Sequence, residues 1–255
     1  MKDILRQIFV VLTIIATIVI NGLANALPIN GLNTGQISDR FRVYFVPAGY
    51  VFSIWGLIYL GLIAFAIFQA LPAQRENPRL RASGWWIGLG GLANSAWIFL
   101  WHYEQFPLTL VAMLVLLATL IVTYLRLGIG RMAVPAAETW TTRLTFSVYL
   151  GWITVATVAN VTSLLDYVKW NGFGLAPEIW MSLVLAAVLA IAALMNFTRR
   201  DVAYTLVILW ALAGIAIKHA AVAAVATPTW VTFALVALTL VAALYWRKPA
   251  LKAAR

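Results

Sequence analysis

YLGWITVATVAN, residues 149–160, places aromatic and polar groups inside a long apolar run. Residues four apart on a helix share a face, so Trp152, Ala156 and Asn160 would form one stripe. Tyr149 lies beside this stripe. Because an amide in hydrocarbon has to find a hydrogen-bond partner, we expect the stripe to face the interior of a helical bundle and not the lipid.

The composition indicates an integral membrane protein. The chain has 255 residues, of which 64% are hydrophobic and 10% are charged, whereas a soluble domain is about 25% charged. A soluble fold of this length could not cover so much apolar surface, so the lipid bilayer is the expected surrounding. The net charge is +10, and we assign the basic residues to loops that set the orientation in the membrane. The sequence has no basic stripe with interleaved aromatic residues, so nucleic-acid binding is not predicted.

The apolar runs predict the number of membrane crossings. A helix that crosses a bilayer needs about 20 mostly apolar residues. Eight such runs are present, which predicts an all-α, polytopic helical bundle of about eight transmembrane helices. The runs are residues 7–27, 47–71, 83–103, 107–126, 143–166, 177–197, 202–222 and 228–246.

The basic residues fall unequally on the two sides that eight crossings would define. One side, which would hold both termini, carries Lys2, Arg6, Arg75, Arg79, Arg81, Arg126, Arg131, Arg143, Arg199, Arg200, Arg247, Lys248, Lys252 and Arg255. The other side carries Arg40, Arg42, Lys169 and Lys218. The positive-inside rule therefore predicts cytoplasmic termini, and we expect a bacterial inner membrane. The first run also resembles a signal peptide ending in ANA, but its apolar core is long for one, so we expect it to be retained.

The third predicted span repeats the pattern of the fifth. WIGLGGLAN, residues 86–94, aligns with WITVATVAN, and Trp86, Gly90 and Asn94 form the matching stripe. Trp97 extends this stripe by almost one turn. Two such faces, if opposed, would enclose an aromatic space with two amides, which is the general form of a small-molecule pocket. The alternative is helix packing, in which small residues allow close approach and amides hydrogen-bond between spans.

Few residues suggest other chemistry. His219, near the end of the seventh run, could ligate a metal, although a single interfacial histidine more often serves as a hydrogen-bonding group. No cluster of histidines and carboxylates resembles a metal site. The chain has no cysteine, which excludes disulfides and thiolate chemistry. No catalytic residue is predicted, and a conventional hydrolase or transferase is not expected.

Three segments resemble the TspO/MBR family, the tryptophan-rich sensory proteins that include the translocator protein, or peripheral benzodiazepine receptor. VPAGYVFSIWGLIY (46–59) resembles the second helix of that family, LANSAW (92–97) its third helix, and residues 149–160 its fifth. The resemblance covers residues 1–168 and implies a five-helix bundle with a pocket beneath the loop that joins helices one and two. The ligand-binding residues it implies are Trp55, Tyr59, Asn94, Trp97, Tyr149, Trp152, Ala156 and Asn160.

The resemblance also implies a ligand and a role. The expected ligand is a tetrapyrrole, namely a porphyrin, haem or a bacteriochlorophyll-type molecule, with sterol-like molecules bound by some members. The expected role is sensory or regulatory. Oxidative breakdown of porphyrin with the help of tryptophan is implied by the resemblance alone.

The last three predicted spans, in residues 169–255, lie outside that five-helix unit and end in a basic tail. They are rich in alanine and glycine, as in WALAGIAIKHAAVAAVA (210–226), and small residues allow close helix contact. We expect these spans to pack on the first five, to form a homodimer, or to dock onto a larger membrane complex.

Three functions are therefore weighed. The first is a tetrapyrrole-binding sensor or regulator. The second is an accessory structural subunit of a larger membrane complex, for example a photosynthetic pigment–protein complex. The third is a transporter of a small hydrophobic molecule, against which stands the lack of an inverted repeat or a pair of broken helices.

Overall fold

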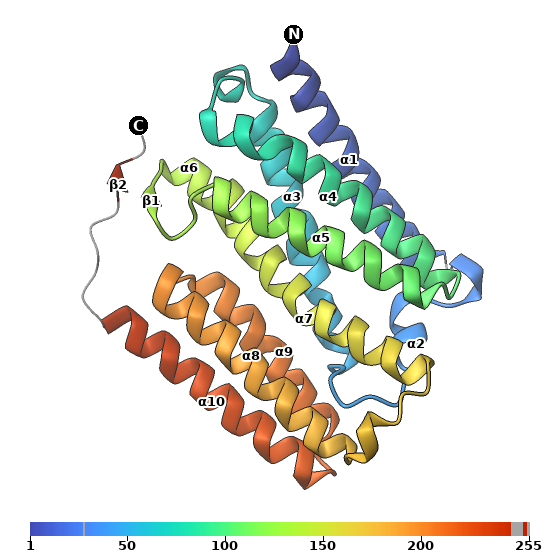
Figure 1. Ribbon diagram of the computed structural model, residues 1–255. Helices are drawn as coiled ribbons and strands as arrows, with labels where there is room; N and C mark the ends of the chain where they lie inside the picture. The colour runs from blue at the N-terminus through green and yellow to red at the C-terminus, as the bar shows by residue number, and fades with distance from the viewer. Residues whose placement is uncertain (28, 246–251, 254–255) are drawn as a thin grey trace.

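The computed structural model describes residues 1–27, 29–245 and 252–253, and nearly all of them are helical (Figure 1). The long helices are α1 Lys2–Ala26, α3 Ile54–Ala70, α4 Pro78–His102, α5 Phe106–Arg126, α7 Leu144–Tyr167, α8 Pro177–Arg199, α9 Val202–Lys218 and α10 Ala223–Tyr245. The short helices are α2 Thr34–Ser38 and α6 Ala136–Glu138, with further helical turns at Ile29–Gly31, Gly49–Ser53, Pro72–Gln74, Thr139–Arg143 and Gly172–Gly174. Two short parallel strands, β1 Met132–Ala133 and β2 Lys252–Ala253, pair with each other.

The predicted all-α membrane bundle is confirmed. Among the described residues, six helical segments are long and apolar enough to cross a membrane, namely Lys2–Ala26, Gly49–Ala70, Phe106–Arg126, Ala136–Tyr167, Pro177–Arg199 and Ala223–Tyr245. Helix α9 is apolar but has only 17 residues. Helix α4 has 25 residues, with an asparagine and several glycines and serines that lower its hydropathy. Both helices nevertheless run from one end of the bundle to the other (Figure 1).

The predicted boundary between the seventh and eighth spans differs from the structure. Helix α9 ends at Lys218, whereas the seventh run was expected to continue to residue 222. Helix α10 then begins at Ala223, ahead of the predicted residue 228, and includes Pro228. Pro228 lies inside α10, past its first turn, where it removes one main-chain N–H donor but does not end the helix, so it did not mark the break. The predicted end at residue 246 lies outside the described residues.

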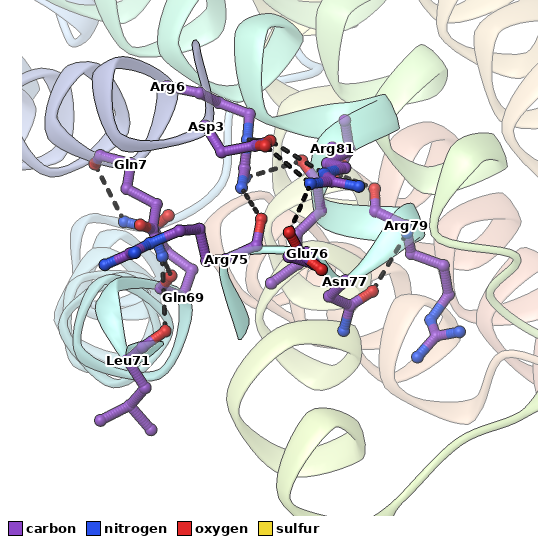
Figure 2. Close-up of polar contacts among 12 residues, drawn as sticks. Asp3, Arg6, Gln7, Gln69, Leu71, Arg75, Glu76, Asn77, Arg79 and Arg81 are labelled. Carbon is purple, nitrogen blue, oxygen red and sulfur yellow. Dashed lines mark hydrogen bonds and ion pairs between the residues drawn. The ribbon is translucent and has the colours of Figure 1, made fainter. Parts of the chain in front are cut away.

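Polar contacts show which loops lie at each end of the bundle. At the end that holds the N-terminus, Arg6 donates hydrogen bonds to the main-chain oxygens of Leu80 (3.0 Å) and Arg75 (2.9 Å), and Arg81 donates two to Asp3 (Figure 2). The sequence places these arginines on the more basic side, so the charge segregation and the fold agree. Arg247, Lys248 and Arg255 of the basic tail lie outside the described residues.

Contacts at the opposite end join the less basic loops. Lys218 pairs with Asp39 at 3.0 Å, and the main-chain N–H of Arg42 donates to Asp166 at 3.2 Å. Arg40 pairs with Glu104. The loops after α1, α4, α7 and α9 therefore gather at one end, as alternating crossings require.

The long helices form two groups. In the first, α1 packs on α4, α4 on α5, α5 on α7, α7 on α3, and α3 on α1, which closes a five-helix ring. In the second, α10 packs on α8 and α9, and this group, coloured orange to red in Figure 1, meets the ring where α9 packs on α7. We call the second group the outer layer.

Polar groups and a close approach fasten the outer layer to the ring. Asp201, which caps the start of α9 by accepting from the Tyr204 N–H, also accepts hydrogen bonds from Tyr124 Oη (2.8 Å) and Ser147 Oγ (2.6 Å). A Cβ at Gly151 of α7 would lie 3.0 Å from the main-chain oxygen of Tyr204. Glycine at this position therefore lets α9 lie close against α7.

Candidate ligand pocket

A pocket lies inside the five-helix ring, at the end opposite the N-terminus. It is lined by residues of α3, α4, α5 and α7, and by residues 34–52, which belong to the connection between α1 and α3. It contains about 560 Å³ of space not filled by atoms, part of which is open to the outside.

Five of the eight predicted ligand-binding residues meet in this pocket. They are Trp55, Trp97, Trp152, Ala156 and Asn160. The stripe on α7 thus faces inward, as its spacing indicated. Trp101, near the end of α4, was not among the predicted ligand-binding residues and also lines the pocket.

Aromatic rings form most of the pocket wall. Trp152 meets Phe52 edge-on with ring centroids 5.6 Å apart, and it meets Trp55 edge-on at 6.2 Å. Trp97 stacks on Trp101 at 5.2 Å with an interplanar angle of 18°. Such walls present both faces and edges of aromatic rings, which suits a flat apolar molecule.

Two indole N–H groups of this wall have no hydrogen-bond partner among the described residues. Trp97 is 8% exposed and Trp152 is 2% exposed, and the Nε1 atom of each is buried and unpaired. A buried unpaired donor costs about 1–3 kcal/mol. The indole of Trp101, in contrast, donates to the main-chain oxygen of Thr34 at 3.2 Å. An acceptor atom on a ligand could satisfy the two unpaired groups.

Asn160 is held in the wall by α5. Its Nδ2 donates to Thr109 Oγ1 at 3.1 Å, and the residue is 3% exposed. The amide of Asn160 therefore links α7 to α5 in addition to lining the pocket.

Asn94 and Tyr149 belong to a polar layer beside the pocket. Asn94 donates to Tyr149 Oη at 2.9 Å and accepts from Asn21 Nδ2 at 2.7 Å. These bonds join α4, α7 and α1, which matches the helix-packing interpretation of the Asn94 stripe. Asn21 was not singled out from the sequence, although an amide within the first span was a visible signal.

A smaller cavity lies on another part of the same ring. It contains about 320 Å³ of unfilled space, and its lining includes Trp86, Gly90 and Tyr149. The two stripes thus meet in two separate cavities, with Trp97 beside the α7 stripe in the larger pocket and Tyr149 beside Trp86 and Gly90 in the smaller one. Tyr59 lines neither cavity and stacks on Trp55 with centroids 5.6 Å apart.

His219 follows the end of α9 and meets the ring of Tyr44 edge-on at 5.3 Å. Burial and the neighbouring Lys218 ammonium lower the pKa of His219 from its usual value. Within residues 1–27, 29–245 and 252–253, no group of three or more histidine, cysteine and acidic residues could hold a metal ion. His219 therefore serves as an uncharged aromatic contact in this arrangement.

These features define a polytopic helical membrane protein with an aromatic pocket inside a five-helix ring. The sequence model of the family described as TSPO-like protein matches residues 7–245. The chain belongs to this family of TSPO-like proteins, and the match extends through the outer layer as well as the ring. No curated protein and no solved structure matches the chain.

Proposed function

We propose that the chain binds a tetrapyrrole, such as a porphyrin, haem or a bacteriochlorophyll-type molecule, in this pocket and acts as a sensor or regulator. Two unpaired indole N–H groups on the wall of one aromatic pocket carry the proposal. A tetrapyrrole offers a flat apolar ring for the aromatic walls and carboxylate or carbonyl oxygens for the indole donors. Membership of the TSPO-like family supports the same ligand class.

A titration of the purified protein with a porphyrin tests this proposal, with the absorbance band of the porphyrin as readout. We expect saturable binding that Trp152→Leu weakens by about tenfold, because loss of one well-packed aromatic contact with its hydrogen bond costs about 1.4 kcal/mol or more. Trp230→Leu is the matched control, since Trp230 lies in α10 and is 44% exposed. Binding that is non-saturable, or unchanged in Trp152→Leu, would contradict the proposal.

We also propose that the five-helix ring within residues 1–168 is the ligand-binding unit and that residues 169–255 support it.

The more basic end of the bundle would face the cytoplasm of a bacterium, because positive loops stay on that side. Single cysteines introduced at Arg75 and Asp166, labelled from outside intact cells, would test this orientation. Labelling at position 75 in place of 166 would contradict it. Three alternatives remain predictions: that the protein is an accessory subunit of a larger membrane complex, that it forms a homodimer, and that it transports a small hydrophobic molecule.

A further inference from the structure

Residues 29–53, here called the closing loop, form the outer wall of the pocket. Val46, Pro47 and Phe52 of this loop line the pocket directly. The first half of the loop is held by α4, where His102 Nε2 hydrogen-bonds Thr34 Oγ1 at 3.1 Å. The position of the second half depends on other contacts.

Helix α9 of the outer layer holds that second half. The Ala48 N–H donates to the main-chain oxygen of Gly214 at 3.3 Å, and Trp210 Nε1 donates to the main-chain oxygen of Val51 at 3.2 Å. Tyr50 meets the Trp210 ring edge-on at 5.4 Å. Two main-chain groups of the loop, flanking Pro47 and Phe52, are thus satisfied by α9.

Further contacts with the outer layer lie nearer the end of the bundle. Lys218 pairs with Asp39 at 3.0 Å, and Tyr44 Oη donates to Glu178 of α8 at 2.8 Å. Both involve exposed or half-buried groups, so they add less than the buried contacts around Gly214. Together they place the loop between the ring and the outer layer.

Gly214 sets how closely α9 approaches the loop. A Cβ at this position would lie 2.2 Å from Val51 Cγ2, which no real pair of atoms tolerates, and 3.4 Å from Pro47 Cβ. Val51 is fully buried, so its side chain has little room to turn away. A side chain at residue 214 therefore pushes the closing loop, including the pocket residue Pro47.

We infer that α9 positions the closing loop over the pocket, with Gly214 and Trp210 as positioning residues. The outer layer then has a defined role, which is to keep the pocket closed on the side that the five-helix ring leaves to a loop. A shift of α9 relative to α7 changes access to the pocket. The effect on ligand binding rests on the proposed function, whereas loop closure can be measured without a ligand.

The absence of cysteine from the chain allows a direct measurement of closure. Ser163 lines the pocket and is 2% exposed, so Ser163→Cys introduces a single thiol behind the closing loop. In this background we expect Gly214→Ala to raise the rate of maleimide labelling by about tenfold, because overpacking displaces the loop. Gly22→Ala is the matched control, since a Cβ at Gly22 meets nothing within 4 Å.

A second substitution tests whether the clash with Val51 is what displaces the closing loop. Val51→Ala removes the methyl that a Cβ at 214 would strike and leaves Pro47 Cβ at 3.4 Å and Val51 Cβ at 3.5 Å as the nearest atoms, which are ordinary contacts. Gly214→Ala should therefore add nothing to the labelling rate in the Val51→Ala background. An equal rise in both backgrounds, or no rise in either, would overturn the inference.

Two more measurements keep the inference separable from the proposed function. Trp210→Phe removes the N–H donated to Val51 and leaves a smaller aromatic ring against Tyr50, so it should also raise the labelling rate, which provides a result if Gly214→Ala does not fold. Porphyrin affinity should fall in Gly214→Ala and return to the Val51→Ala value in the double variant. If labelling follows this pattern and no variant binds porphyrin, the inference about loop closure holds and the proposed function fails. If porphyrin binds and the labelling rate is the same in all variants, the proposed function holds and the inference about loop closure fails.

Discussion

The carboxylate of Asp201 at the start of α9 accepts a hydrogen bond from the hydroxyl of Tyr124 at the end of α5, over 2.8 Å. The same carboxylate accepts from Ser147 of α7, and Asp201 is only 8% exposed. One buried side chain thus joins the outer layer to two helices of the ring. This joint lies at the end of α9 opposite the closing loop, so it fixes the helix that positions the loop.

Replacement of Asp201 by alanine should loosen this joint. The change leaves two hydroxyl donors without their acceptor, so we expect a loss of about 2–4 kcal/mol in the free energy of unfolding. Thermal denaturation in detergent measures the effect. Asp39→Ala serves as the control, because the Asp39 side chain is 64% exposed and should contribute little. Equal stability of the two variants would contradict the role of Asp201.

Asn94 should matter more for stability than for ligand affinity. Its amide bonds Asn21 and Tyr149 and lies outside the pocket wall, so Asn94→Ala takes a hydrogen-bond partner from each of these two buried residues, while Asn21 keeps its bond to the main-chain oxygen of Thr17. We expect a loss of about 1–3 kcal/mol in the free energy of unfolding. Porphyrin affinity should change less than it does in Trp152→Leu. A larger loss of affinity than of stability would place Asn94 at the ligand and contradict the packing role.

The contact between His219 and Tyr44 should weaken at low pH. Burial lowers the pKa of His219 in the folded protein, so folding disfavours its protonation; this stability is fully present above the unfolded pKa of about 6.5 and is lost as the pH falls below it and through the folded pKa. The charged groups that face this pair are already partnered, since Lys218 pairs with Asp39 and Tyr44 donates to Glu178. His219→Gln should flatten the change in melting temperature between about pH 5 and pH 8. A wild-type profile that matches this variant would argue against the contact.

The sequence predicted the membrane fold because hydropathy and length act along the chain. The eight runs matched eight long helices, and the spacing of Trp152, Ala156 and Asn160 predicted the inward face of α7. The boundary between the last two spans was placed at Pro228, but this proline lies inside α10 and does not break the helix. The break itself, around residues 219–222, consists of histidine, alanine and valine and carries no turn signal.

The site could be predicted only in part, because partners from distant segments leave no periodic signal. The amide of Asn94 could have served a ligand or a helix, and only its distance to Asn21 separates these interpretations. The approach of Gly214 to Val51 depends on which loop covers which helix. Glycine in an alanine-rich span indicated close packing but not its partner.

The measurement that tests the central claim most directly is binding of a porphyrin dicarboxylate and of its dimethyl ester to the wild-type protein and to the double variant Trp97→Phe/Trp152→Phe. This variant keeps aromatic walls and removes both unpaired indole donors. We expect the wild type to prefer the dicarboxylate by about tenfold, since hydrogen bonds to a charged acceptor are the stronger ones, and we expect the variant to lose this preference. Equal affinity of the wild type for both molecules, or an unchanged preference in the variant, would contradict it.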